Sequence, residues 1–139
     1  MRISARFIAF LMLAMTMMLT SCQQTVGVEA EMNGLSYRVV TVDELQTMLE
    51  KKDFLLVNVH TPFEGNIPQT DLHLPYDEIS QKLDQLPAEK DAKLLVYCLT
   101  SGMAKEAIAT LLEAGYTNLW MLEGGTTAWL EAGQILETE

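Results

Sequence analysis

The sequence predicts an α/β fold of three layers, in which a mostly parallel central sheet of about five strands is flanked by helices. Two apolar runs, at residues 53–60 (DFLLVNVH) and 92–98 (AKLLVYC), are continuous rather than alternating, which is typical of strands buried on both faces of a parallel sheet. A helical pattern over residues 103–114 follows the second run directly. Strands that alternate with helices along a chain indicate parallel strands joined by crossover helices.

The remaining elements follow from local signals along the chain. Thr41 is a favourable N-cap, and the residues after it carry an apolar stripe and end in two lysines, which predicts a helix. Pro87 ends a second, short helix, and Gly115 ends a third. The predicted strands are residues 37–41, 53–60, 72–75, 92–98 and 118–122, and the predicted helices are 42–52, 77–86, 103–114 and 126–132.

The first residues, MRISARFIAFLMLAMTMMLTSC, have the order of a secretory signal. Arg2 and Arg6 form a basic start, and residues 7–19 form an apolar stretch that is short for a full membrane span. The sequence Leu-Thr-Ser-Cys that ends at Cys22 resembles the bacterial lipobox. We therefore expect residues 1–21 to be a lipoprotein signal peptide, with a plain secretory signal and an uncleaved anchor as the alternatives.

Acylation of Cys22 would anchor the chain to a membrane, since each buried methylene of an acyl chain adds about 0.8 kcal/mol. We expect residues 22–36 to be the lipidated cysteine with a flexible tether, and residues 37–139 to be the folded domain. The location would be extracytoplasmic, on the bacterial cell membrane or the outer membrane. Residue 23 is Gln rather than Asp, so the usual signal for retention at an inner membrane is missing.

Charge and composition exclude several classes of function. The formal net charge is −10, and such a surface repels phosphate backbones, so we expect no nucleic-acid partner. The chain has two histidines and two cysteines without metal-ligand spacing, so we expect no metal and no cofactor. No arginine follows Arg38, which disfavours phosphoryl chemistry because that chemistry relies on guanidinium groups.

Cys98 stands where a predicted strand ends and a predicted helix begins. A sulfur at that place faces backbone N–H groups and the positive end of a helix dipole, which favours the nucleophilic thiolate. Residues 99–103 would supply the N–H groups, with hydroxyl donors on Thr100 and Ser101 and a tight curve at Gly102. The alternative is that Cys98 is an ordinary buried residue. If Cys22 is lipidated, Cys98 has no cysteine with which to pair.

The second half of the chain carries a combination of short motifs. They are Tyr97-Cys98, Ser101-Gly102, Gly115-Tyr116 and the run from Leu122 to Trp129 (LEGGTTAW), at spacings that leave room for one helix between Cys98 and Gly115. This combination resembles the rhodanese-like domain family, and the resemblance covers roughly residues 37–137. It implies the three-layer rhodanese-like fold, with its mostly parallel sheet.

The resemblance also implies an activity. In rhodaneses the cysteine at the position of Cys98 accepts a sulfane sulfur as a persulfide and passes it to an acceptor. The donor would be thiosulfate, polysulfide or a persulfide, and the acceptor a thiol or cyanide. Substrate-binding positions would be Leu99, Thr100, Ser101, Gly102, Met103 and His60. The alternatives are a protein-binding module in which the cysteine is vestigial, and a thiol redox or sulfide-handling protein that uses Cys98.

The first half departs from the usual motif of the family. Where many rhodaneses have Asp-Val-Arg and a later Gly-His, this chain has Asn58-Val59-His60 and Gly65-Asn66. Met103 stands where many single-domain members have Arg. We therefore expect weak use of the thiosulfate dianion. For His60 three interpretations stay open: an anion donor, a general acid, or a hydrogen-bonded residue at a strand end.

Overall fold

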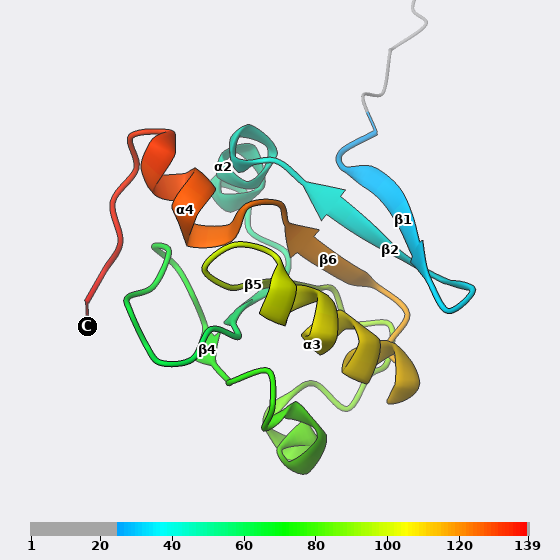
Figure 1. Ribbon diagram of the computed structural model, residues 1–139. Coiled ribbons are helices and arrows are strands. Elements are labelled where there is room, and N and C mark those ends of the chain that lie inside the picture. Colours follow the sequence, from blue (N-terminus) through cyan, green and yellow to red (C-terminus); the bar gives the residue numbers. More distant parts are fainter. Residues whose placement is uncertain (1–24, 139) are drawn as a thin grey trace, which may run out of the picture.

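The computed structural model describes residues 25–138 as a six-stranded sheet with helices on both faces (Figure 1). The strands are β1 Val28–Met32, β2 Leu35–Val40, β3 Leu55–Asn58, β4 Leu72–His73, β5 Leu94–Tyr97 and β6 Leu119–Leu122. The α-helices in this part of the chain are α2 Val42–Glu50, α3 Gly102–Glu113 and α4 Gly125–Glu131, and two short 3-10 turns are Ile79–Gln81 and Leu83–Gln85.

The sheet is parallel except at one edge. The strand order is β1-β2-β6-β5-β3-β4, and only β1 runs antiparallel to its neighbour. The predicted α/β class and mostly parallel sheet are therefore confirmed, with one strand more than expected. Asn58 pairs with Tyr97 at the carboxyl ends of β3 and β5, so the segments that follow these two strands begin at the same edge. Functional sites of parallel sheets lie at this edge.

The additional strand corrects the predicted tether. Residues 28–36 are part of the folded domain: β1 pairs with β2 through a turn at Asn33 and Gly34, which both have positive φ. An Asn-Gly pair between two strands is a strong hairpin signal, because both residues tolerate the left-handed backbone. Ala30 and Met32 also pack against the core, which stabilises the hairpin. The domain therefore does not begin at residue 37.

The central strands separate two apolar cores. On one face the strands pack against α3 through residues such as Ala107, Ile108 and Leu111. On the other face they pack against α2 and α4, where Leu45 and Trp129 are buried. Figure 1 shows α3 on one side of the sheet, with α2 and α4 on the other. This arrangement gives three layers and buries β5 completely, as the continuous apolar run predicts.

The prediction of a helix over residues 77–86 is wrong. The segment instead forms the two 3-10 turns, in which Gln81 and Lys82 donate backbone hydrogen bonds to the residues three positions before them. Ile79 is the only fully buried residue in the two turns. A segment this short, with so little apolar surface to bury, gains too little from packing to offset the cost of a longer α-helix.

The predicted signal peptide and Cys22 lie outside the described residues. Within residues 25–138, no helix is both long and apolar enough to span a membrane. The lipobox interpretation therefore rests on the sequence of the first 22 residues alone.

Candidate active site

Cys98 lies at the base of a cleft at the carboxyl end of β5. Its residue exposure is 1%, and within the described chain it is a free thiol. The cleft has a volume of about 330 Å³. One wall is made by the segment after Cys98 and the start of α3, and the facing residues are His60 and Tyr76. The lining residues are His60, Tyr76, Cys98, Leu99, Thr100, Gly102, Met103 and Glu106.

The segment that follows Cys98 rests directly on the start of α4. The carbonyl oxygens of Cys98 and Leu99 accept the N–H groups of Thr126 and Thr127, each at 2.9 Å. Gly125 has φ +54°, and a Cβ on it would lie 2.1 Å from the Cys98 carbonyl oxygen. The second glycine of the LEGGTTAW motif, Gly125, is therefore needed because the backbone of the cysteine segment occupies the space of a side chain.

The carbonyls of this segment are paired, but its amides are free. The N–H groups of residues 99–103 make no hydrogen bond to any described part of the chain. They include the first amides of α3, whose cap residue Ser101 makes no side-chain capping bond. Free amides at a helix start form a site for negative charge. The surroundings of Cys98 are therefore suited to a sulfur anion.

The structure differs from the expectations for two predicted substrate-binding residues, Ser101 and Gly102. The hydroxyl oxygen of Ser101 accepts the N–H of Gly124 at 3.1 Å, and Ser101 does not line the cleft. Gly102 has no positive φ, and a Cβ there would meet nothing within 4 Å. The expected conformational need for glycine at Gly102 is therefore wrong, whereas Gly115, with φ +89°, has the left-handed backbone expected at a helix end. Five of the predicted substrate-binding residues do line the cleft: Leu99, Thr100, Gly102, Met103 and His60.

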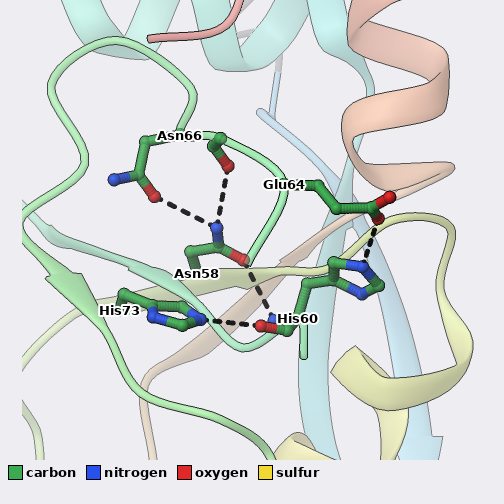
Figure 2. Close-up of polar contacts among 6 residues, drawn as sticks. Asn58, His60, Glu64, Asn66 and His73 are labelled. Atoms are coloured by element: carbon green, nitrogen blue, oxygen red, sulfur yellow. Dashed lines mark hydrogen bonds and ion pairs between the residues drawn. The ribbon is translucent and has the colours of Figure 1, made fainter. Parts of the chain in front are cut away.

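Asn58 organises the loop that follows β3. It is 1% exposed, and its Nδ2 donates to the carbonyl oxygen of Gly65 at 3.1 Å and to Oδ1 of Asn66 at 3.0 Å (Figure 2). Its Oδ1 accepts the backbone N–H of His60 at 3.0 Å. Both partners of Nδ2 are acceptors, so a carboxylate could not replace this amide. Asn58 and Asn66 are thus a matched neutral pair that holds the loop.

His60 is held from several sides. Its Nε2 lies 2.6 Å from Oε2 of Glu64, and its backbone carbonyl oxygen lies 2.7 Å from Nε2 of His73 (Figure 2). The ring is nearly buried, and its Nδ1 has no hydrogen-bond partner. His60 therefore lies at a strand end, as one of the sequence interpretations has it, and also reaches the cleft. The pairing with Glu64 is not apparent from the sequence.

Tyr97 holds the loop that follows β3 through its hydroxyl group. Its phenol oxygen accepts the N–H of Ile67 at 3.0 Å and shares a hydrogen bond of 2.8 Å with the hydroxyl of Thr70. Burial raises the pKa of Tyr97 above its ordinary value of 10.0, and the hydrogen bond with Thr70 opposes this shift. From the sequence, Tyr97 was recognised only as part of the Tyr97-Cys98 motif. A phenol in a fully buried strand needs a hydrogen-bond partner for its hydroxyl, and this need could have indicated the role of Tyr97.

No lysine or arginine lines the cleft, and the one carboxylate in its lining belongs to Glu106. Within residues 25–138, no group of three or more His, Cys, Asp or Glu side chains is arranged to hold a metal ion. The described site therefore offers a thiol, free amides and one imidazole for chemistry.

Comparisons with known proteins agree with this fold. The sequence profile described as Rhodanese-like domain matches residues 41–132. A sulfurtransferase of Allochromatium vinosum is 33% identical over 91 residues, which cover 63% of this chain and 82% of that protein. The crystal structure of a rhodanese-related protein from Thermoplasma volcanium is 27% identical and superposes with a TM-score of 0.63, covering 74% of this chain and 100% of that one. A tRNA uridine(34) hydroxylase of Escherichia coli is 26% identical over 88 residues, which cover 59% of this chain and 25% of that protein.

The fold and the cysteine at the end of β5 thus define the class of protein, a parallel α/β domain with a thiol at the strand edge. More particularly, the chain belongs to the rhodanese-like domain family. Its relatives support a function of the sulfurtransferase type. The hydroxylase shows that this domain also occurs within longer proteins that have other names.

Proposed function

We propose that this protein is a sulfurtransferase that carries a sulfane sulfur as a persulfide on Cys98 and passes it to a thiophilic acceptor. The observation that carries the proposal is the set of unpaired amides of residues 99–103 directly after a buried, free thiol. A persulfide bears its negative charge on the outer sulfur, and inward-facing amides stabilise such a charge without a metal. The sulfur donor would be thiosulfate, a polysulfide or a persulfide, and the acceptor a thiol or cyanide.

The donor is expected to carry little negative charge. The cleft lining has no lysine or arginine and includes Glu106, and the net charge of the whole chain is −10. A dianion such as thiosulfate would lack the charge-assisted hydrogen bonds that a guanidinium provides. We therefore expect polysulfides and low-molecular-weight persulfides to be better donors than thiosulfate.

The test is the intact mass of the full-length chain, purified in mild detergent, after incubation with polysulfide. Addition of one sulfur to the wild type and none to Cys98→Ser would support the proposal. A mixed disulfide with a small thiol, and no persulfide, would instead favour the thiol redox function. If Cys98 does not react, the result would instead support the protein-binding module.

We also propose that the protein is anchored outside the cytoplasm through acyl chains on Cys22. The lipobox-like sequence before Cys22 supports this location. Metabolic labelling with a fatty acid should label the wild type and leave Cys22→Ser unlabelled. Equal labelling of both proteins would rule out the lipid anchor.

A further inference from the structure

His60 holds an unpaired atom beside the cysteine cleft. Its Nδ1 is the one buried side-chain nitrogen or oxygen without a hydrogen-bond partner in residues 25–138. The residue is 7% exposed, and it lines the same cleft as Cys98. A buried polar atom without a partner destabilises a fold, so it needs an explanation such as a ligand or a catalytic role. We looked for that explanation in the chemistry of the cleft.

The pairing with Glu64 determines the state of the ring. A carboxylate only accepts hydrogen bonds, so the 2.6 Å contact between Nε2 of His60 and Oε2 of Glu64 requires the proton on Nε2. In the neutral ring, Nδ1 is then a bare acceptor, and a second proton would have to bind there. Figure 2 shows the two ring nitrogens, with only Nε2 turned to Glu64. Glu64 would stabilise the positive charge of the doubly protonated ring.

Nδ1 of His60 is not paired with the thiol of Cys98. No hydrogen bond joins Nδ1 of His60 to Sγ of Cys98 in the described chain, although both residues line the cleft. The proposed partner of Nδ1 is therefore an atom of a bound sulfur donor rather than Sγ of Cys98.

Other titratable groups near His60 are less suited to proton transfer. Glu106 is exposed on α3, and Tyr76 is only partly buried. The second histidine, His73, uses its Nε2 on the backbone carbonyl of His60. The groups that face His60 or share its cleft are Glu64, His73, Tyr76, Cys98 and Glu106.

We infer that His60 is a catalytic residue that carries the proton of the sulfur-transfer step, with Glu64 as its positioning residue. The inference rests on the proposed function and deepens it, because it selects donors whose leaving group is a basic thiolate. Such a triad of nucleophile, proton carrier and orienting carboxylate is a general solution for activating a thiol.

The step balances with a persulfide donor R–S–SH. The Cys98 sulfur attacks the outer sulfur of the donor, one S–S bond forms, and the S–S bond of the donor breaks. Cys98 attacks as its thiolate, and Nδ1 of the doubly protonated His60 ring gives its proton to the leaving sulfur, which departs as R–SH. The products are the Cys98 persulfide and a thiol, and no outside oxidant or reductant is needed.

The test compares two donors that differ in their need for a proton. An aliphatic persulfide leaves as a basic thiolate, whereas benzenethiosulfonate leaves as a sulfinate that needs no proton. The rate of sulfur loading on Cys98 would be measured by intact mass in single turnovers of the full-length chain. For His60→Gln we expect a loss of roughly 100-fold or more with the persulfide. With benzenethiosulfonate the loss should be less than about tenfold, because only proton transfer is removed.

A purely structural role of His60 would lower both rates by the same factor, and that result would overturn the inference. Unchanged rates with both donors would overturn it as well. If wild-type Cys98 takes up sulfur from neither donor, the proposed function itself fails, so the two failures are distinguishable.

Glu64→Gln is a second variant that should fold normally, because the Glu64 side chain is 55% exposed. The amide oxygen of Gln still accepts the Nε2 proton but does not stabilise the charged ring. We expect roughly a tenfold loss with the persulfide and little change with benzenethiosulfonate. An equal loss with both donors would contradict the positioning role.

Discussion

Gly125 and Cys98 are in such close contact that a Cβ on Gly125 would lie 2.1 Å from the carbonyl oxygen of Cys98. The same contact continues along the segment, with 2.7 Å from that Cβ to the carbonyl oxygen of Thr100. The geometry of the cysteine segment is therefore determined by a helix that begins 27 residues later in the chain.

Gly125→Ala should destabilise the domain by about 3 kcal/mol or more, because it combines a left-handed backbone with a steric clash. The control is Gly115→Ala, because Gly115 also has a positive φ but open space around a Cβ, so this change should cost about 1 kcal/mol. Urea denaturation would give both values. Equal losses would mean that the contact between α4 and the cysteine segment is not important.

Tyr97→Phe should cost about 2 kcal/mol, because it leaves the buried N–H of Ile67 without a partner. Tyr116→Phe is the control, since it removes a hydroxyl that donates to the carbonyl oxygen of Pro87, away from this loop, and should cost about 1 kcal/mol.

The same variant predicts a change at alkaline pH. Burial raises the pKa of folded Tyr97 above 10.0, so the unfolded chain loses its phenol proton first as the pH rises. Unfolding then releases a proton, and the stability of the wild type should fall above about pH 10. Stability against pH, measured for wild type and Tyr97→Phe, should show less of this fall in the variant. Parallel curves would contradict the assigned shift.

Asn58→Asp should destabilise the domain by about 3 kcal/mol near neutral pH, because a buried carboxylate would face two acceptor oxygens. The loss should shrink as the pH falls, since a protonated carboxyl donates one hydrogen bond. Asn118→Asp is the control, because its Nδ2 makes one exposed contact, to the carbonyl oxygen of Asp91. Thermal unfolding at several pH values would test both, and an unchanged Asn58→Asp protein would contradict the neutral pair.

Met103→Arg should improve the use of thiosulfate mainly by lowering KM. Met103 lines the cleft, and a guanidinium there would supply the charge-assisted hydrogen bonds that the wild type lacks. Met103→Gln controls for the loss of apolar surface and should leave the preference unchanged. The measurement is kcat/KM for thiosulfate and for a persulfide. A wild type that already prefers thiosulfate would contradict this explanation of donor choice.

The fold was predictable where hydrophobic pattern decides structure. The continuous apolar runs before Asn58 and Cys98 form β3 and β5, because only strands buried on both faces are apolar throughout. The hairpin of β1 and β2 was missed, although Asn33-Gly34 is a turn signal, because its strands are partly exposed and polar. Such a strand gains its stability from its partner rather than from its own sequence.

The sequence by itself determined the α/β class, the family resemblance and the position of Cys98 at a strand end, because these depend on patterns within short segments. Only the tertiary structure decided what surrounds the thiol. The contact of Gly125 with Cys98, the partners of Asn58 and the unpaired Nδ1 of His60 all depend on where the folded chain places these atoms in space. The physical reason is that hydrogen bonding and steric contact act over a few ångströms in space, whereas a sequence pattern records only neighbours along the chain.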